Sequence, residues 1–143
     1  MQYEYSAQIA PDPDGGFLVS FPDVPEAITS GPDLPSALHA ASEALGLALR
    51  GYVELGRPLP PRSAKGKGLI SIPVDPADAL KLAVIEAFGA SGLSKTELAA
   101  RLGKSEAVAR RILNPDHPSK LSAMEDALAA LGKNVVVSVL DAA

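Results

Sequence analysis

Carboxylates are the most frequent residues in the first part of the chain that could carry out chemistry: Asp12, Asp14, Asp23, Glu26 and Glu43. A two-metal nuclease needs several carboxylates that converge on ions roughly 3.5–4 Å apart. Asp12 and Asp14 stand among prolines and glycines, however, which is the composition of a turn. Glu43 falls in a predicted helix, where a solvated position is the simpler interpretation. We therefore expect no catalytic and no metal-binding residue, and no enzyme activity.

The other side chains suited to catalysis or metal binding are isolated. Neither His39 nor His117 has further ligand-type residues at the spacing of a metal site. The chain has no cysteine, which excludes disulfides, thiolate metal sites and cysteine nucleophiles. No motif supports a Ser-His-Asp arrangement, and we expect no cofactor.

Basic side chains in the second half point to a different chemistry, the binding of phosphates and base edges. From Lys95 to Lys120 there are six basic and three acidic residues. Arg110 and Arg111 are adjacent and fall on the polar face of a predicted helix. Arginine is suited both to phosphates and to the guanine edge. This segment therefore predicts contact with nucleic acid.

The segment 93–113 (LSKTELAARLGKSEAVARRIL) has the layout of a helix-turn-helix. That motif needs a first helix of about two turns, a tight turn, and a second helix that enters the major groove. Ser94 and Glu97 spell a capping box. Ala99 is small where the helices would touch, and Gly103 suits a turn that needs positive φ. Lys104 departs from the pattern, since the residue after the turn glycine is usually apolar.

Operator DNA is the expected ligand of the polar face of this segment and of the helix start that follows. A four-helix packing unit that binds no nucleic acid is the alternative. The predicted DNA-binding residues are Lys95, Thr96, Lys104, Ser105, Glu106, Ala107, Arg110, Arg111, Asn114, Ser119 and Lys120.

The elements that must position these residues form two groups. Alternating or β-rich runs predict strands at 3–9, 17–21, 26–30 and 69–74, and an apolar stripe predicts a helix over 34–55. The order β-β-β-α-β predicts a small antiparallel sheet with one helix packed on a face. From Asp75 the pattern predicts four helices, the last opened by Ser119 or Ser122. The fold class is therefore α+β, with an N-terminal domain over 1–74 and an all-α domain with a terminal strand over 75–143.

The terminal strand is predicted for the β-branched run 134–140 (NVVVSVL). A strand after four helices leaves its backbone groups unpaired. The same strand of a second copy can pair with it about a two-fold axis, which would also set two recognition helices about 34 Å apart on DNA. Pairing with the N-terminal sheet of the same chain is the alternative. The predicted dimerisation residues are Val135, Val136, Val137, Val139 and Leu140.

Charge also divides the chain. Residues 1–60 hold two basic and eight acidic residues, a net charge of −6, whereas residues 61–143 hold eleven basic and nine acidic ones, a net charge of +2. This asymmetry suggests two different partners, although two solvated surfaces would also produce it. No apolar run approaches the roughly 18 residues of a membrane span, and the first ten residues lack the features of a signal peptide. We expect a cytoplasmic protein without membrane association.

The stretch 12–45 (DPDGGFLVSFPDVPEAITSGPDLPSALHAASEAL) resembles the HicB antitoxin family. It contains an Asp-Gly-Gly-aromatic hairpin, a Phe-Pro-Asp-x-Pro loop, a short strand, and a helix rich in Ala, Glu and Leu. The downstream strings LGRPLPPRS (55–63) and ALAALGK (127–133) are also similar to the family. The match extends to the subtype with a C-terminal helix-turn-helix.

This resemblance implies a degenerate ribonuclease-H-like fold without catalysis, and a protein that represses its own operon. It also implies a partner, a small basic mRNA-cleaving toxin of the HicA family, which an acidic domain would cap. A helix-turn-helix transcription regulator whose N-terminal domain senses a small molecule is the first alternative, and a ribonuclease-H-like nuclease is the second. The residues expected at or near the toxin are Asp12, Asp14, Gly15, Gly16, Phe21, Pro22, Asp23 and Val24.

Overall fold

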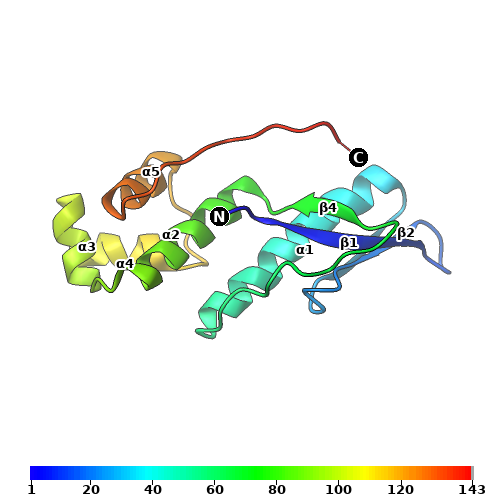
Figure 1. The fold of residues 1–143 in the computed structure, drawn as a ribbon, viewed down its shortest axis with the longest axis horizontal. Helices are drawn as coiled ribbons and strands as arrows, with labels where there is room; N and C mark the ends of the chain where they lie inside the picture. Colours follow the sequence, from blue (N-terminus) through cyan, green and yellow to red (C-terminus); the bar gives the residue numbers. More distant parts are fainter. Residues whose placement is uncertain (143) are drawn as a thin grey trace. The chain divides into compact units, whose positions relative to one another are not determined.

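The computed structural model describes residues 1–142. The chain divides into two compact units, and the boundary along the sequence lies between Pro76 and Ala77. The N-terminal unit contains one antiparallel sheet and one long helix, and the C-terminal unit contains four helices (Figure 1). The predicted α+β class is confirmed. None of the helices in this part of the chain is long and apolar enough to cross a membrane.

The N-terminal unit has the predicted element order. Strands β1 (Glu4–Pro11), β2 (Phe17–Ser20) and β3 (Ile28–Gly31) precede helix α1 (Leu34–Glu54), and β4 (Ile70–Pro73) follows it. The strand order in the sheet is β3-β2-β1-β4 with antiparallel pairing throughout. The second half of β1 pairs with β2 and its first half pairs with β4. The long first strand therefore connects β4 to the pair formed by β2 and β3.

Helix α1 packs its apolar stripe onto one face of this sheet. The side chain of Asp33 caps the helix by accepting a 2.8 Å hydrogen bond from the backbone N–H of Ser36. Leu45 and Leu49 on the helix are fully buried, as is Val19 on β2. Gly31 allows the close approach at the helix start, because a Cβ there would lie 2.5 Å from the backbone nitrogen of Ala37.

The C-terminal unit consists of α2 (Pro76–Ser91), α3 (Lys95–Leu102), α4 (Glu106–Leu113) and α5 (Leu121–Ala130). One hydrophobic cluster of this unit consists of Leu98, Ala99 and Ala109, each at most 4% exposed. Ala99 thus takes the predicted place between α3 and α4. Partly buried apolar side chains from α2 to α5 surround the cluster: Phe88, Leu102, Leu113, Ala130 and Leu131.

The run 134–140 is extended but belongs to no sheet among residues 1–142. The predicted terminal strand is therefore not formed within the single chain, and pairing of the run, with a second copy or with the N-terminal sheet, stays a prediction. A strand exists only where a neighbour exchanges backbone hydrogen bonds with it. The run is nevertheless strongly apolar and exposed, with Val136 at 86%, Val139 at 91% and Leu140 at 80%.

Candidate DNA interface and partner surface

Two short helices joined by a glycine turn form the candidate DNA interface. The Ser94 hydroxyl accepts a 3.1 Å bond from the Glu97 N–H, and the Glu97 carboxylate accepts a 3.3 Å bond from the Ser94 N–H. The predicted capping box is thereby confirmed. Gly103 ends α3 with φ of 65°, as predicted, and the Ser105 hydroxyl caps α4 by accepting from the Val108 N–H.

The predicted contact residues on these helices line an exposed surface. Two residues of this surface form an ion pair with each other, because the Glu106 carboxylate lies 3.6 Å from the Arg110 guanidinium. The same carboxylate accepts a 3.4 Å hydrogen bond from the Thr96 hydroxyl. An exposed pair at i,i+4 spacing contributes only a few tenths of a kcal/mol, so Arg110 can exchange Glu106 for an outside anion. The exposed members of the predicted set are Lys95, Thr96, Lys104, Ser105, Glu106, Ala107, Arg110, Arg111, Asn114 and Lys120.

Ser119 has a different position from the one predicted. Helix α5 begins after Lys120, which makes no side-chain cap, so neither Ser119 nor Ser122 opens it. The Ser119 hydroxyl instead accepts a 2.7 Å bond from the Nζ of Lys81. Its side chain is therefore part of the internal structure of the unit and is not a free phosphate ligand.

Lys81 is the residue of this region that the sequence analysis missed. It lies on α2 and is 3% exposed, and burial lowers its pKa to about 8. A signal was present, because Lys81 precedes Val84 and Ile85 by three and four positions and thus shares the apolar face of α2.

The hairpin turn between β1 and β2 presents the acidic residues expected to face a toxin. The Asp12 carboxylate accepts a 3.0 Å bond from the Asp14 N–H, and the Asp12 carbonyl accepts a 2.9 Å bond from the Gly15 N–H. Gly15 and Gly16 have φ of 100° and 80°, which explains why glycine follows the aspartates. Asp14 and Gly15 are exposed, while Asp12 and Gly16 are half-buried.

The loop after β2 is less accessible than the sequence analysis expected. Phe21 is 2% exposed and Val24 is fully buried, so in this structure their side chains do not offer a surface for direct contact, and a place near the toxin interface stays a prediction for both. Both apolar side chains turn into the core of the N-terminal unit, because exposure there would leave large hydrocarbon surface in water. Pro22 remains exposed, and Asp23 is half-buried.

Asp23 ties this loop to the segment that follows α1. Its carboxylate accepts bonds from the Ser63 N–H at 2.9 Å, the Ser63 hydroxyl at 3.0 Å and the Ala64 N–H at 2.8 Å. These bonds, the one from Ala64 foremost, hold the pKa of Asp23 below its ordinary value. The carboxylate is thus already engaged within the chain.

A second set of contacts, centred on Tyr52, restrains the end of the same loop. The Tyr52 hydroxyl donates to both Glu26 oxygens, at 2.8 and 2.9 Å, and the Arg57 guanidinium lies 4.3 Å from the centre of the Tyr52 ring. The hydrogen bond to Glu26 raises the pKa of Tyr52. No periodic pattern predicts this contact, since its residues come from a loop, a helix end and a linker.

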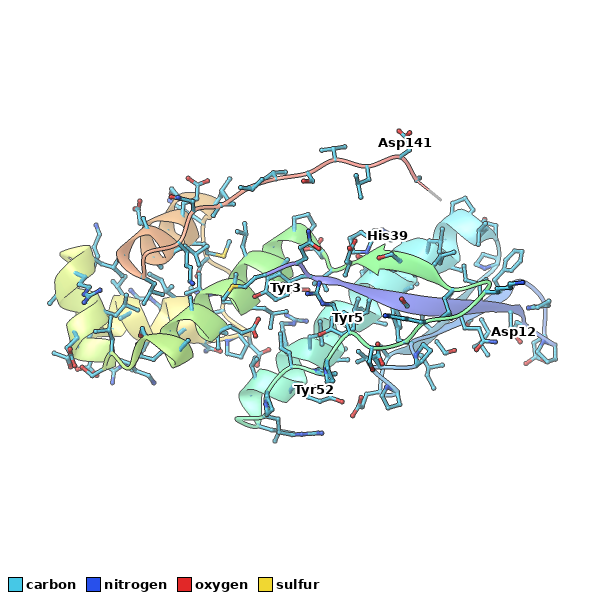
Figure 2. The ribbon with its side chains drawn as sticks, in the orientation of Figure 1. Tyr3, Tyr5, Asp12, His39, Tyr52 and Asp141 are labelled. Atoms are coloured by element: carbon cyan, nitrogen blue, oxygen red, sulfur yellow. The ribbon has the colours of Figure 1, made fainter. Side chains whose placement is uncertain are left out.

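The side chains of the N-terminal unit that are suited to catalysis or metal binding do not form one group. Figure 2 shows Asp12, His39 and Tyr52 at separate places on the N-terminal unit. Glu43 lies 3.2 Å from the imidazole of His39, one turn away on α1. No group of three His, Cys, Asp or Glu side chains within residues 1–142 is placed to hold a metal ion.

Comparison with known proteins identifies the family. Residues 4–83 match the model of the HicB-like antitoxin of bacterial toxin-antitoxin systems. Antitoxin HicB of Escherichia coli strain K12 is 36% identical over 133 residues, which cover 92% of this chain and 95% of that protein. Antitoxin HicB 1 of Photorhabdus laumondii is 32% identical over 94% of this chain and 86% of its own length. Antitoxin HicB of Pseudomonas fluorescens strain Pf0-1 is 32% identical over 97% and 95%. The chain therefore belongs to the HicB-like antitoxin family.

Proposed function

We propose that this antitoxin neutralises a small, basic, mRNA-cleaving toxin through residues 1–74 and represses its own operon through residues 75–143. The observation that carries the proposal is the match to antitoxins over almost the whole chain. The two units supply different surfaces for the two partners, an acidic hairpin and an exposed face with two adjacent arginines. Both partners belong in the cytoplasm, where we place the protein.

Toxin binding is assigned to the acidic N-terminal unit. Residues 1–76 carry five basic and nine acidic residues, and such a surface attracts and orients a basic partner. With Phe21 and Val24 buried, we propose that the exposed hairpin tip and Pro22 make the direct contacts, and that the buried pair shapes the loop beneath them.

Co-expression with the toxin tests this assignment. Residues 1–74 should restore growth to cells that make the toxin, and Asp14→Lys in the full chain should weaken the rescue. Asp126→Lys makes the same charge change on an exposed residue of α5 and should leave rescue intact. Rescue that requires residues 75–143 would reverse the assignment of the two units.

Operator binding is assigned to α3 and α4, with α4 in the major groove. Arg110→Ala should narrow the difference in affinity between operator and random DNA, because a lost base contact costs about 1–3 kcal/mol for the correct sequence alone. Arg111→Ala should lower both affinities and flatten the salt dependence, as the loss of a phosphate contact does. Unchanged operator binding in the double variant would remove α4 from the groove.

Dimerisation is assigned to the exposed run Val135, Val136, Val137, Val139 and Leu140. A second copy can supply the backbone partner that this chain does not, and it would bury side chains such as Val137, which is 80% exposed. A chain truncated after Lys133 should sediment as a monomer, lose most operator affinity and still bind toxin. A truncated chain that stays dimeric with full affinity would place the dimer interface elsewhere.

The protein acts by binding and, in this proposal, hydrolyses nothing. Its carboxylates serve turns, caps and clamps: Asp12 in the hairpin, Asp23 and Glu26 in the loop after β2. Purified protein free of toxin should cleave neither RNA, DNA nor their hybrid with magnesium or manganese present. Cleavage that disappears in Asp12→Asn or Asp23→Asn would restore the nuclease interpretation.

A further inference from the structure

The C-terminal unit buries one lysine in an arrangement that the proposed DNA binding does not by itself explain. Among residues 1–142, Lys81 is the charged side chain that lies in a core, at 3% exposure. Burying an ammonium is costly, and an apolar side chain of similar length would often serve stability as well or better. The position of the lysine therefore calls for a role other than stability.

The acceptors of the Lys81 ammonium lie at the end of α4 and in the loop behind it. Its Nζ donates to the carbonyl of Ile112 at 2.7 Å, to the hydroxyl of Ser119 at 2.7 Å and to the carbonyl of Arg111 at 3.3 Å. An ammonium has three donors, so these three contacts use all of them. One side chain of α2 thus joins the last turn of α4 to the segment that leads into α5.

The carbonyls at a helix C-terminus lack partners within the helix and carry the negative end of its dipole. A cation bound to these carbonyls restrains the last turn of the helix, so that it neither shifts along the helix axis nor rotates about it. The residues on the outer side of the same turn are Arg110, Arg111 and Asn114, all of them exposed. The Arg111 residue thus has its carbonyl bonded on the inside and its guanidinium offered on the outside.

We propose that Lys81 is a positioning residue for DNA recognition, whose ammonium holds the end of α4 so that Arg110, Arg111 and Asn114 meet DNA in one register. This inference rests on the proposed operator binding. Lys81 itself touches no DNA in this account; it acts through the Arg111 and Ile112 carbonyls and through Ser119.

Chemical rescue tests the proposal, because the chain has no cysteine of its own. In Lys81→Cys, alkylation of the unfolded chain with 2-bromoethylamine and refolding rebuilds an ammonium at nearly lysine length. Alkylation with iodoethane builds the same side chain without its terminal ammonium group. We expect the ethyl form to bind a duplex from upstream of its gene about 5- to 150-fold more weakly than wild type, the range of one lost base contact. The aminoethyl form should recover most of the lost affinity. The two forms should bind a duplex of shuffled sequence with nearly equal affinity.

Two further variants distinguish the positioning of α4 by Lys81 from its contribution to the stability of the fold. Ser119→Ala removes one acceptor and should weaken operator binding in the same direction but less. Leu82→Ala truncates the neighbouring, fully buried residue of α2 and leaves all three acceptors in place. It should lower the melting temperature yet retain operator affinity while folded. Equal affinities of the ethyl and aminoethyl forms, or an equal loss in Leu82→Ala, would overturn the proposal.

Hydrogen exchange provides a measurement that does not depend on DNA. The backbone amides of α4 should exchange faster in the ethyl form than in the aminoethyl form. If the wild-type chain binds no operator but this difference is present, the proposed DNA function fails while the hold of Lys81 on α4 stands. If the α4 amides exchange alike in both forms, the positioning role of Lys81 is wrong.

Discussion

Asp23→Asn should destabilise the N-terminal unit by removing the clamp between the loop after β2 and residues 63–64. The carboxylate accepts three hydrogen bonds of 2.8–3.0 Å, and the amide keeps one acceptor oxygen and turns a donor toward the Ser63 and Ala64 donors. A bond to a charged acceptor contributes about 1.5–3 kcal/mol where water is excluded. Asp23 is only half-buried, so we expect a net loss of about 1 kcal/mol in the free energy of unfolding at neutral pH.

The pH dependence of this loss has a definite sign. The hydrogen bonds, led by that of Ala64, lower the pKa of Asp23 in the folded chain. Its stabilising contribution is therefore complete above the unfolded pKa of about 3.9 and disappears as pH falls through the lower folded value. The difference between wild type and Asp23→Asn should be constant near neutrality and shrink in acid.

Tyrosine fluorescence provides the assay. The chain has three tyrosines, Tyr3, Tyr5 and Tyr52, and no tryptophan, so urea unfolding followed at the tyrosine emission reports on the N-terminal unit alone. Asp14→Asn makes the same chemical change at the exposed hairpin tip and is the matched control. Equal unfolding midpoints for wild type and Asp23→Asn, or a difference that grows in acid, would refute the reasoning.

Four other substitutions test the buried lysine, two glycines and the bond between Glu26 and Tyr52. Burial lowers the pKa of Lys81 to about 8, against about 10.4 when unfolded. The unfolded chain therefore binds more protons between these values, and wild type should gain about 1–2 kcal/mol of stability over Lys81→Met from pH 8 to 9.5, measured by helical ellipticity. Gly16→Ala, at φ of 80° and against the backbone of β3, should cost about 2 kcal/mol in urea unfolding, whereas Gly51→Ala, in open space on α1, should gain about 0.5–1 kcal/mol. Glu26→Gln should lower the raised pKa of Tyr52, which is read from the ultraviolet titration of the tyrosines.

Local signals in the sequence predicted what depends on near neighbours. The capping box of Ser94 and Glu97 and the left-handed turn at Gly103 each involve residues within a few positions. The element order β-β-β-α-β followed from alternation and turn composition, because both patterns are local along the chain. These features depend on residues that are close together in the sequence, and the structure contains all of them.

Features that depend on distant residues were missed. The burial of Phe21 and Val24 requires knowing which way a loop turns, which periodicity does not encode. The contact between Lys81 and Ser119 joins residues 38 positions apart. The run 134–140 has strand composition, but a strand also needs a neighbour, and the chain by itself provides none within residues 1–142.

Inhibition of the toxin's RNA cleavage tests the central claim most directly. The small basic protein encoded beside this gene would be purified, and its cleavage of an mRNA followed as the full-length antitoxin is titrated in. We predict that cleavage falls in proportion to added antitoxin and stops near stoichiometric amounts, and that Asp14→Lys requires more protein while Asp126→Lys matches wild type. Cleavage that continues unchanged at a large excess of the folded antitoxin would contradict the account.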